Sequence, residues 1–223
     1  MPRVGSRHRC PECLMSGLLC LCDDLPKVPL RRTRVIVLMH YLELKTSTNT
    51  ARIANLMLPE SEVRLRGRPG QPLEEQGLVV PERRSLFLFP SPQSRVLDGD
   101  FLRELSSEPV NLIVPDGSWR QAQKVAQRVP ALAGVQHVRL EPGPPSEYQL
   151  RAEPNPEAVC TLEAIARALG VLEGQAVRDS MEHWFRVMVE RTLWSRGKLK
   201  DAEAPNVPDE AKFARRRSGA SSG

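Results

Sequence analysis

Short, nearly unbroken apolar runs recur along the chain at the length of β-strands. Four of them predict strands, over residues 34–39, 86–89, 110–114 and 135–140. Because these runs are apolar at consecutive positions, both faces of each strand are expected to be covered. The pattern therefore favours a mostly parallel sheet with helices on its two sides.

Apolar residues that repeat at helical spacing lie between and after these runs. They predict helices over residues 119–129, 162–169 and 181–192, and a further helix that begins near residues 48–50. Strand and helix patterns that alternate in this way are typical of an α/β domain.

Two segments rich in proline, glycine and charge interrupt the pattern. Residues 67–81 predict an exposed loop, and residues 141–158, which contain five prolines, predict a long loop. A loop of that length within a compact domain usually has a function. From residue 200 onward, small, charged and proline residues predominate, and they predict a disordered basic tail over residues 200–223.

Arginine gives the chain its basic character. The formal net charge is +5, from 32 Lys and Arg against 27 Asp and Glu, and the sequence pI is near 9.2. Arginine binds phosphate through two parallel hydrogen bonds, so its clustering favours RNA or another polyanion as partner, although a solvated basic surface is the alternative. Aromatic residues form 4% of the chain, which disfavours a platform for stacked bases. Phosphate contacts are expected from Arg31, Arg32, Arg215, Arg216 and Arg217.

Cys10, Cys13, Cys20 and Cys22 lie close together, with the spacing C-x2-C followed by C-x-C. Four thiolates this close in sequence can surround one tetrahedral zinc ion. Two disulfides or plain buried thiols are the alternatives. No signal-peptide pattern precedes the cluster and no apolar run is long enough to span a bilayer, so we expect a cytoplasmic protein with reduced thiols. That favours zinc.

The strand over residues 110–114 runs directly into Pro115-Asp116-Gly117-Ser118-Trp119. Ligands bind α/β sheets at the carboxyl ends of strands, which places Asp116 at such an end. Gly117 permits a tight turn, and Ser118 suits the start of the next helix. The same letters also fit an ordinary strand–turn–helix connection. Glycine-rich motifs for dinucleotides or nucleoside triphosphates are absent from the sequence.

Residues 115–122 resemble the signature of the DTW-domain family, which reads Asp-x-Thr-Trp or Asp-x-Ser-Trp. The resemblance covers roughly residues 8–195 and departs from the usual pattern at Tyr41, Ser118 and Cys160, where Pro, Thr and Ser are common. The further matching segments are the four cysteines; His40 to Thr50, similar to a His-Pro-x-Glu segment that runs on to Thr-Asn-Thr; Tyr148 to Arg151, similar to Tyr-x-x-Arg; and Cys160 to Ala164, similar to Ser-Thr-Leu-Glu-Ala.

The resemblance implies a specific fold and activity. Members of the family are tRNA-uridine aminocarboxypropyltransferases, which move the 3-amino-3-carboxypropyl group of S-adenosylmethionine to the imino nitrogen of a tRNA uridine and release 5′-methylthioadenosine. Their fold is similar to the SPOUT class, with a knotted cofactor site. The chain would then divide into a zinc knuckle at 1–30, a catalytic α/β domain at 31–199 and a basic disordered tail at 200–223.

Within this scheme Asp116 is the candidate general base, because the uridine nitrogen must lose a proton. An ordinary aspartate is a weak base, so Asp116 could instead hold the uracil edge or the amino group of the cofactor. For several of the proposed cofactor contacts, helix capping is the alternative role. The residues expected to contact S-adenosylmethionine are Thr48, Asn49, Thr50, Gly117, Ser118, Trp119, Leu140, Cys160 and Thr161.

Two other functional classes fit the sequence. One is an S-adenosylmethionine-dependent RNA methyltransferase on a similar fold, which would release S-adenosylhomocysteine instead of methylthioadenosine. The other is a zinc-knuckle module that binds RNA without catalysis. The sequence leaves open which uridine is modified and which oligomeric state the protein adopts.

Overall fold

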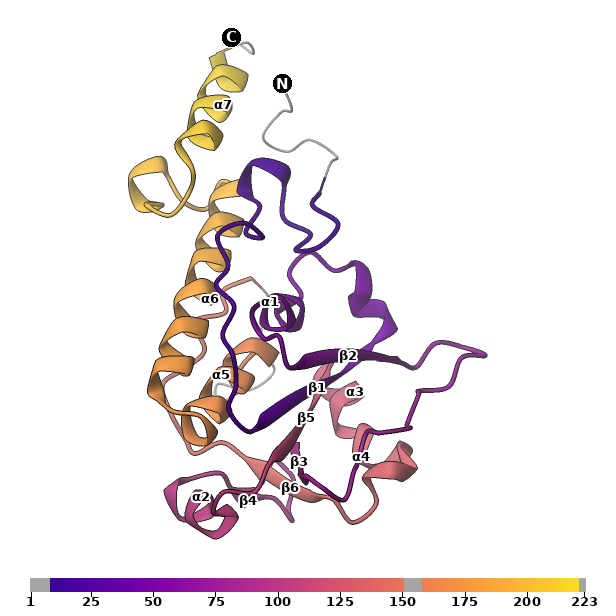
Figure 1. Ribbon diagram of the computed structural model, residues 1–223. Helices are drawn as coiled ribbons and strands as arrows, with labels where there is room; N and C mark the ends of the chain where they lie inside the picture. The colour runs from indigo at the N-terminus through magenta and orange to yellow at the C-terminus, as the bar shows by residue number, and fades with distance from the viewer. Residues whose placement is uncertain (1–8, 151–157, 221–223) are drawn as a thin grey trace.

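A parallel six-stranded sheet forms the centre of the molecule in the computed structural model, which describes residues 9–150 and 158–220 (Figure 1). The strand order is β2-β1-β5-β3-β6-β4, and every pairing in the sheet is parallel. The four apolar runs are confirmed as β1, β3, β5 and β6. The strands are β1 Thr33–His40, β2 Ser61–Arg66, β3 Arg84–Leu88, β4 Arg95–Val96, β5 Val110–Asp116 and β6 Gln136–Arg139.

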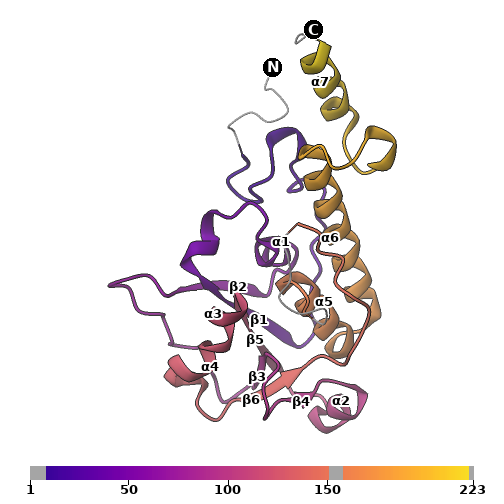
Figure 2. The ribbon, with the colours of Figure 1, turned by 180° about the vertical axis from the view of Figure 1, so that it is seen from behind.

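Alternate residues of each inner strand enter two separate cores. In β1, Val35 and Val37 belong to one buried cluster, whereas Ile36 and Leu38 belong to the other. The sheet is therefore covered on both faces, as the apolar runs predicted. One face carries α1 Thr50–Met57, α2 Gly99–Leu105, α5 Thr161–Leu172 and α6 Gln175–Ser195, and the other carries α3 Trp119–Gln123 and α4 Val125–Arg128 (Figures 1 and 2).

Within the sheet and the helices packed on it, β2, β4 and α2 were not predicted from the sequence. Strand β2 lies at the edge of the sheet with β1 as its neighbour, and all of its residues are half-buried. Its charged residues alternate with apolar ones, so it lacks the unbroken apolar run of an inner strand. The helix expected over residues 119–129 is divided at Lys124 into α3 and α4.

The C-terminal segment differs from the disorder expected over residues 200–223. The structure contains a 3₁₀ helix, Asp201–Glu203, and helix α7, Asp209–Ala220, which extends away from the sheet (Figure 1). Small apolar residues spaced between the charges explain the difference, because Ala204, Val207 and Ala211 are buried. The small and charged residues that predominate in this segment did not indicate that a few apolar side chains would be buried.

Arg191 of α6 connects the N-terminal cysteine segment to the C-terminal segment. Arg191 is 6% exposed. The guanidinium donates hydrogen bonds to the carbonyl of Cys20 at 2.7 Å, the carboxylate of Asp24 at 2.9 Å and the carbonyl of Asn206 at 2.8 Å. Helix α6 therefore contacts both the N-terminal cysteine segment and the C-terminal segment. Among the described helices, none combines the length and the apolar content needed to cross a membrane.

We expect Arg191→Ala to lower the free energy of unfolding by about 3 kcal/mol, because it leaves carbonyl groups without their charged donor. Arg186→Ala is the matched control on the same helix. The Arg186 side chain is 51% exposed in its ion pair, so its loss should cost under about 1 kcal/mol. Urea unfolding of the two variants measures the difference, and equal losses would contradict the role of Arg191.

Candidate active site and metal centre

The sheet opens beside the carboxyl end of β5. Pairing between β3 and β5 ends at Phe87 and Ile113, whereas pairing between β1 and β5 continues to Met39 and Asp116. Pro115 has no N–H group, so it cannot donate a hydrogen bond to a neighbouring strand. The last residues of β5 thus leave β3 and border a cavity.

This cavity has a volume of about 770 Å³, which suits a small-molecule ligand. Segments that follow β1, β3, β5 and β6 line it, together with the start of α5. All nine residues predicted to contact the cofactor lie in its wall beside Asp116, and their roles in binding stay predictions. The main lining segments are residues 48–50, 88–90, 114–120, 139–143 and 158–161.

Asp116 is 4% exposed, and donors from two helix starts hold its carboxylate. The hydroxyl of Thr161, the first residue of α5, donates to Oδ1 at 2.6 Å. The side-chain amide of Asn49 donates to Oδ2 at 2.7 Å. Hydrogen bonds on both oxygens stabilise a negative charge that burial would otherwise disfavour.

Asn49 caps α1 and also donates a hydrogen bond to Asp116, while its contact with the cofactor stays a prediction. Its Oδ1 atom accepts a hydrogen bond from the backbone N–H of Arg52 at 3.0 Å, which caps α1. That bond fixes the orientation of the amide, so its NH₂ group points to Asp116. Close by, Thr50 Oγ1 accepts from the N–H of Leu162 at 3.3 Å and joins the starts of α1 and α5.

Gly117 makes the turn after Asp116 with a φ of +143°, a conformation that favours glycine. A Cβ atom there would lie 2.8 Å from Gln121 Oε1 and 3.2 Å from His40 Cβ. Gln121 is close because its Oε1 accepts a hydrogen bond from the N–H of Ser118, the N-cap of α3, at 2.8 Å. Glycine is thus required by both conformation and space.

Trp119 gives the cavity a flat apolar wall. It remains 39% exposed, which is unusual for so large a side chain. Its ring centroid lies 4.9 Å from that of Phe89, which follows β3. The two rings form a packed aromatic pair at the edge of the cavity, where they can contact an apolar or aromatic part of a ligand.

The four N-terminal cysteines converge on one point. Their sulfur atoms all lie within 4.8 Å of one another, with 3.6 Å between Cys10 and Cys22 and 3.7 Å between Cys13 and Cys20. Sulfur atoms about 2.3 Å from a central zinc ion in a tetrahedron lie about 3.8 Å apart. The same distances are far from the roughly 2.05 Å of a disulfide bond. The donor set therefore fits zinc.

The protonation of these thiols is uneven. Burial raises the pKa of Cys10, but the backbone N–H groups of Cys13 and Glu12 outweigh it and lower that pKa to about 7. Burial and the neighbouring thiols raise the pKa of Cys20 to about 11 and move that of Cys22 upward as well. A bound cation would favour the thiolate form of these side chains.

Comparison with known families agrees with this geometry. The model of the DTW domain matches residues 7–193. The chain belongs to the DTW-domain family.

Curated relatives of this DTW domain carry one functional name. The tRNA-uridine aminocarboxypropyltransferase 2 of Drosophila melanogaster is 30% identical over 180 residues, covering 76% of this chain and 68% of the relative. The Macaca fascicularis enzyme of that name is 28% identical, and the chain spans 57% of its length, with 75% of this chain covered. The tRNA-uridine aminocarboxypropyltransferase A of Arabidopsis thaliana is 30% identical, covering 75% of this chain and 73% of the relative.

Among solved structures, the DTW domain is similar to the SAM-dependent rRNA:acp-transferase of Vulcanisaeta distributa. The sequence identity is 16% and the TM-score is 0.48. The match covers 83% of this chain and 98% of that chain.

Arg66 contacts the backbone of Asp116, and no sequence motif indicated this contact. Its guanidinium donates to the carbonyl of Leu38 at 3.1 Å and to the carbonyl of Asp116 at 3.3 Å. Burial lowers the pKa of Arg66, whereas the charge of Asp116 opposes that shift. Burial, followed by the charge of Arg66, also lowers the pKa of His40. The Arg66 contacts span β1 and β5, so local sequence could not reveal them.

Arg31 and Arg32 lie at the opposite end of the sheet from the cavity. Both precede β1, whereas Asp116 follows the carboxyl end of the parallel strand β5. The Arg32 guanidinium donates to the carbonyls of Leu172 and Ser106, where α5 and α2 end. These contacts give Arg32 a structural role, and the phosphate contacts of Arg32 and of the exposed Arg31 stay predictions.

The three tail arginines lie on α7 and do not line the cavity. Arg215 stacks over the ring of Trp194 at 4.7 Å and donates to its carbonyl. Arg216 donates to Asp201 at 2.9 Å, and Arg217 lies over a phenylalanine ring of the same helix. Arg151 of the Tyr-x-x-Arg segment lies outside the described residues.

We propose that Cys10, Cys13, Cys20 and Cys22 hold one zinc ion, so purified protein should contain about one zinc per chain by elemental analysis. A Cys13→Ala and Cys20→Ala double variant should lose the metal because two ligands cannot complete the tetrahedron. Cys160→Ala, at the fifth cysteine, is the control and should retain it. Full zinc content in the double variant would refute the proposal.

Proposed function

We propose that this protein is a tRNA-uridine aminocarboxypropyltransferase. It transfers the 3-amino-3-carboxypropyl group of S-adenosylmethionine to the imino nitrogen of a tRNA uridine and releases 5′-methylthioadenosine. The observation that carries the proposal is the meeting of separate family motifs, those of Asp116, Asn49 and Thr161, in one cavity. The names of the curated relatives support the same activity.

The cavity has the chemistry expected for S-adenosylmethionine. This molecule carries positive charge on its sulfonium and amino groups, and a buried carboxylate at Asp116 attracts both. The rings of Trp119 and Phe89 offer apolar contact to the uncharged parts of the ligand. The cavity volume of about 770 Å³ leaves room for a nucleotide base beside the cofactor.

The reaction forms a bond between the uridine nitrogen and a carbon of the transferred chain while the bond from that carbon to sulfur breaks. The electron pair leaves with sulfur, and the nitrogen gives up its proton. We assign proton removal to Asp116. The hydrogen bonds from Asn49 and Thr161 fix the orientation of this carboxylate in the wall of the cavity. Holding the amino group of the cofactor is the competing role of Asp116.

The by-product separates this activity from the other functional classes. Incubation with tRNA and labelled S-adenosylmethionine should yield methylthioadenosine and a nucleoside that is heavier by the aminocarboxypropyl group. Release of S-adenosylhomocysteine would indicate a methyltransferase, and RNA binding without either product would indicate a non-catalytic module. Nucleoside mass spectrometry of tRNA from cells that lack the gene identifies the uridine.

Asp116→Asn should lower the single-turnover rate by about 10²–10⁴-fold, because an amide cannot accept the proton. The fold should persist, since the new carbonyl can accept from Asn49 and the new NH₂ can donate to the Thr161 hydroxyl. Asp179→Asn, on the exposed surface of α6, is the control. Near-normal rates in Asp116→Asn would exclude the general-base role. Rescue by more cofactor would indicate that Asp116 binds the cofactor.

Phosphate binding by the tail is tested with point variants, because truncation after residue 200 would also remove the contacts of Asn206 and Asp201 with α6. An Arg216→Gln and Arg217→Gln variant should weaken tRNA binding. It should also reduce the slope of log affinity against log salt by up to about 2, because each phosphate contact contributes about 0.9.

Binding of S-adenosylmethionine should not change in that tail variant. Arg31→Gln tests the amino end of the sheet in the same assay, and Arg103→Gln, an exposed arginine on α2, is the control. If the tRNA affinity of the Arg216→Gln and Arg217→Gln variant depends on salt as that of the wild type does, α7 is not part of the RNA interface.

A further inference from the structure

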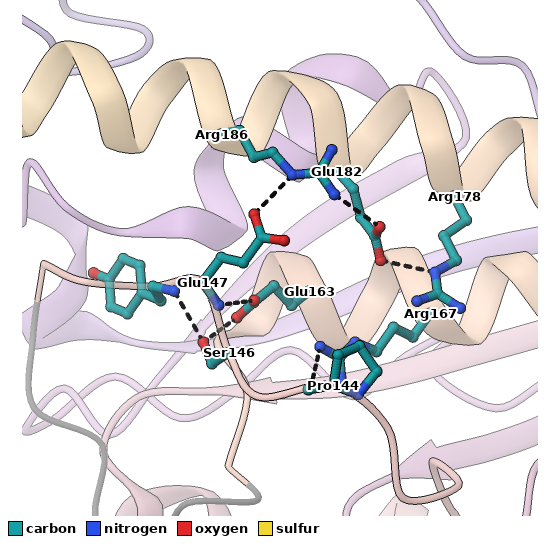
Figure 3. Close-up of polar contacts among 9 residues, drawn as sticks. Pro144, Ser146, Glu147, Glu163, Arg167, Arg178, Glu182 and Arg186 are labelled. Carbon is teal, nitrogen blue, oxygen red and sulfur yellow. Dashed lines mark hydrogen bonds and ion pairs between the residues drawn. The ribbon is translucent and has the colours of Figure 1, made fainter. Parts of the chain in front are cut away.

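A long segment without helix or strand forms one wall of the cavity. After β6 ends at Arg139, residues 140–143 and Tyr148 line the cavity. Loops of this kind are mobile unless side chains attach them to the body of the protein. Figure 3 shows how the part of this loop around Ser146 and Glu147 lies against α5 and α6.

Glu163 of α5 is the buried attachment point of the loop. Glu163 is 3% exposed. Oε1 accepts from the N–H of Glu147 at 2.9 Å, and Oε2 accepts from the hydroxyl of Ser146 at 2.5 Å (Figure 3). The Ser146 hydroxyl oxygen in turn accepts from the N–H of Tyr148 at 3.1 Å. One carboxylate therefore fixes three consecutive loop residues.

The outer attachments of the loop are weaker. Glu147 accepts from Arg186 of α6 at 2.7 Å, but these side chains are 54% and 51% exposed. Arg167 donates to the carbonyl of Pro144 at 2.9 Å (Figure 3). Water and salt screen an exposed ion pair, whereas a buried carboxylate that loses its donors bears the full cost of desolvation. Glu163 thus dominates the attachment.

The same carboxylate reaches the groups that hold Asp116. Oε2 of Glu163 also accepts from the N–H of Cys160 at 3.0 Å, and the next residue, Thr161, donates to Asp116. On the far side of the loop, the Tyr148 hydroxyl donates to the carbonyl of Thr48 at 2.6 Å, directly before Asn49. The loop wall and both donors of Asp116 are connected through these contacts.

We propose that Glu163 is a positioning residue that sets the 140–148 loop in its binding conformation before S-adenosylmethionine arrives. The inference rests on the proposed function and goes beyond it, because Glu163 does not line the cavity. A loop that is ordered in advance lowers the entropic cost of binding, so the contribution of Glu163 falls on cofactor affinity. The rate of the chemical step at Asp116 depends less on Glu163.

Glu163→Gln tests the proposal, since all partners of the carboxylate are donors and an amide places N–H opposite at least one of them. We expect the Kd and KM for S-adenosylmethionine to rise about 10–100-fold, with kcat at saturation changed less than about threefold. Glu147→Gln, which removes the same charge from the exposed pair, is the control and should change Kd less than about threefold.

Ser146→Ala is the second variant in case Glu163→Gln folds poorly by circular dichroism. It removes the hydroxyl between Glu163 and Tyr148, and Kd should rise about 3–10-fold. In the free protein, hydrogen exchange at the amides of Glu147 and Cys160 should accelerate in Glu163→Gln, because both amides donate to the carboxylate.

The outcomes separate this inference from the proposed function. Wild-type affinity in Ser146→Ala, or in a folded Glu163→Gln variant, overturns the positioning role and leaves the activity standing. A fall in kcat with unchanged Kd also overturns it. A wild-type protein that neither binds S-adenosylmethionine in calorimetry nor releases methylthioadenosine overturns the proposed function and this inference together.

Discussion

A buried carboxylate at the end of a central strand needs hydrogen-bond donors around it, and this need organises the candidate site. Asp116 is delivered by β5 into a cavity wall where few of its atoms reach solvent. An unpaired charge in that position would cost several kcal/mol, on the order of the penalty for burying an ion. Its donors come from the starts of α1 and α5, which are remote in the sequence. The two helices must therefore pack together correctly before the site exists.

The cysteine cluster is connected to that packing through α6. Arg191 of α6 holds the carbonyl of Cys20, and α6 packs along α5, which carries Thr161 and Glu163. The cysteines themselves do not line the cavity. An ion bound there would act on the site through the rigidity of α6 and α5, not through its own charge. This separation suits a structural metal, whose closed set of protein ligands leaves no position for a substrate.

The sequence predicts features that depend on local patterns better than contacts between residues that lie far apart in the chain. The inner strands β1, β3, β5 and β6 were predicted because burial on both faces leaves unbroken apolar runs, while the edge strands β2 and β4 lack that signal. Residues at strand ends and helix starts could be assembled into a candidate site, since parallel strands all present their carboxyl ends at one edge. Contacts such as Arg66 with Asp116 or Glu163 with Glu147 left no local pattern. They depend on which side chains the fold brings together.

The departures of this chain from the family pattern have physical consequences at those same points. Tyr41 opens the 3₁₀ helix Tyr41–Lys45, a position where proline is favoured for its fixed φ, and here His40 Nδ1 stabilises the turn by accepting from the N–H of Leu42. Cys160 stands at the N-cap of α5, where serine is a far better hydrogen-bonding cap than a thiol. The carboxylate of Glu163, at the third position of the helix, accepts from the Cys160 N–H, which is the reciprocal bond of a capping box. Because the same carboxylate also holds the loop, Glu163 joins the start of α5 to the loop wall through the backbone N–H groups of residues 160 and 147, which a change from serine to cysteine at position 160 leaves in place.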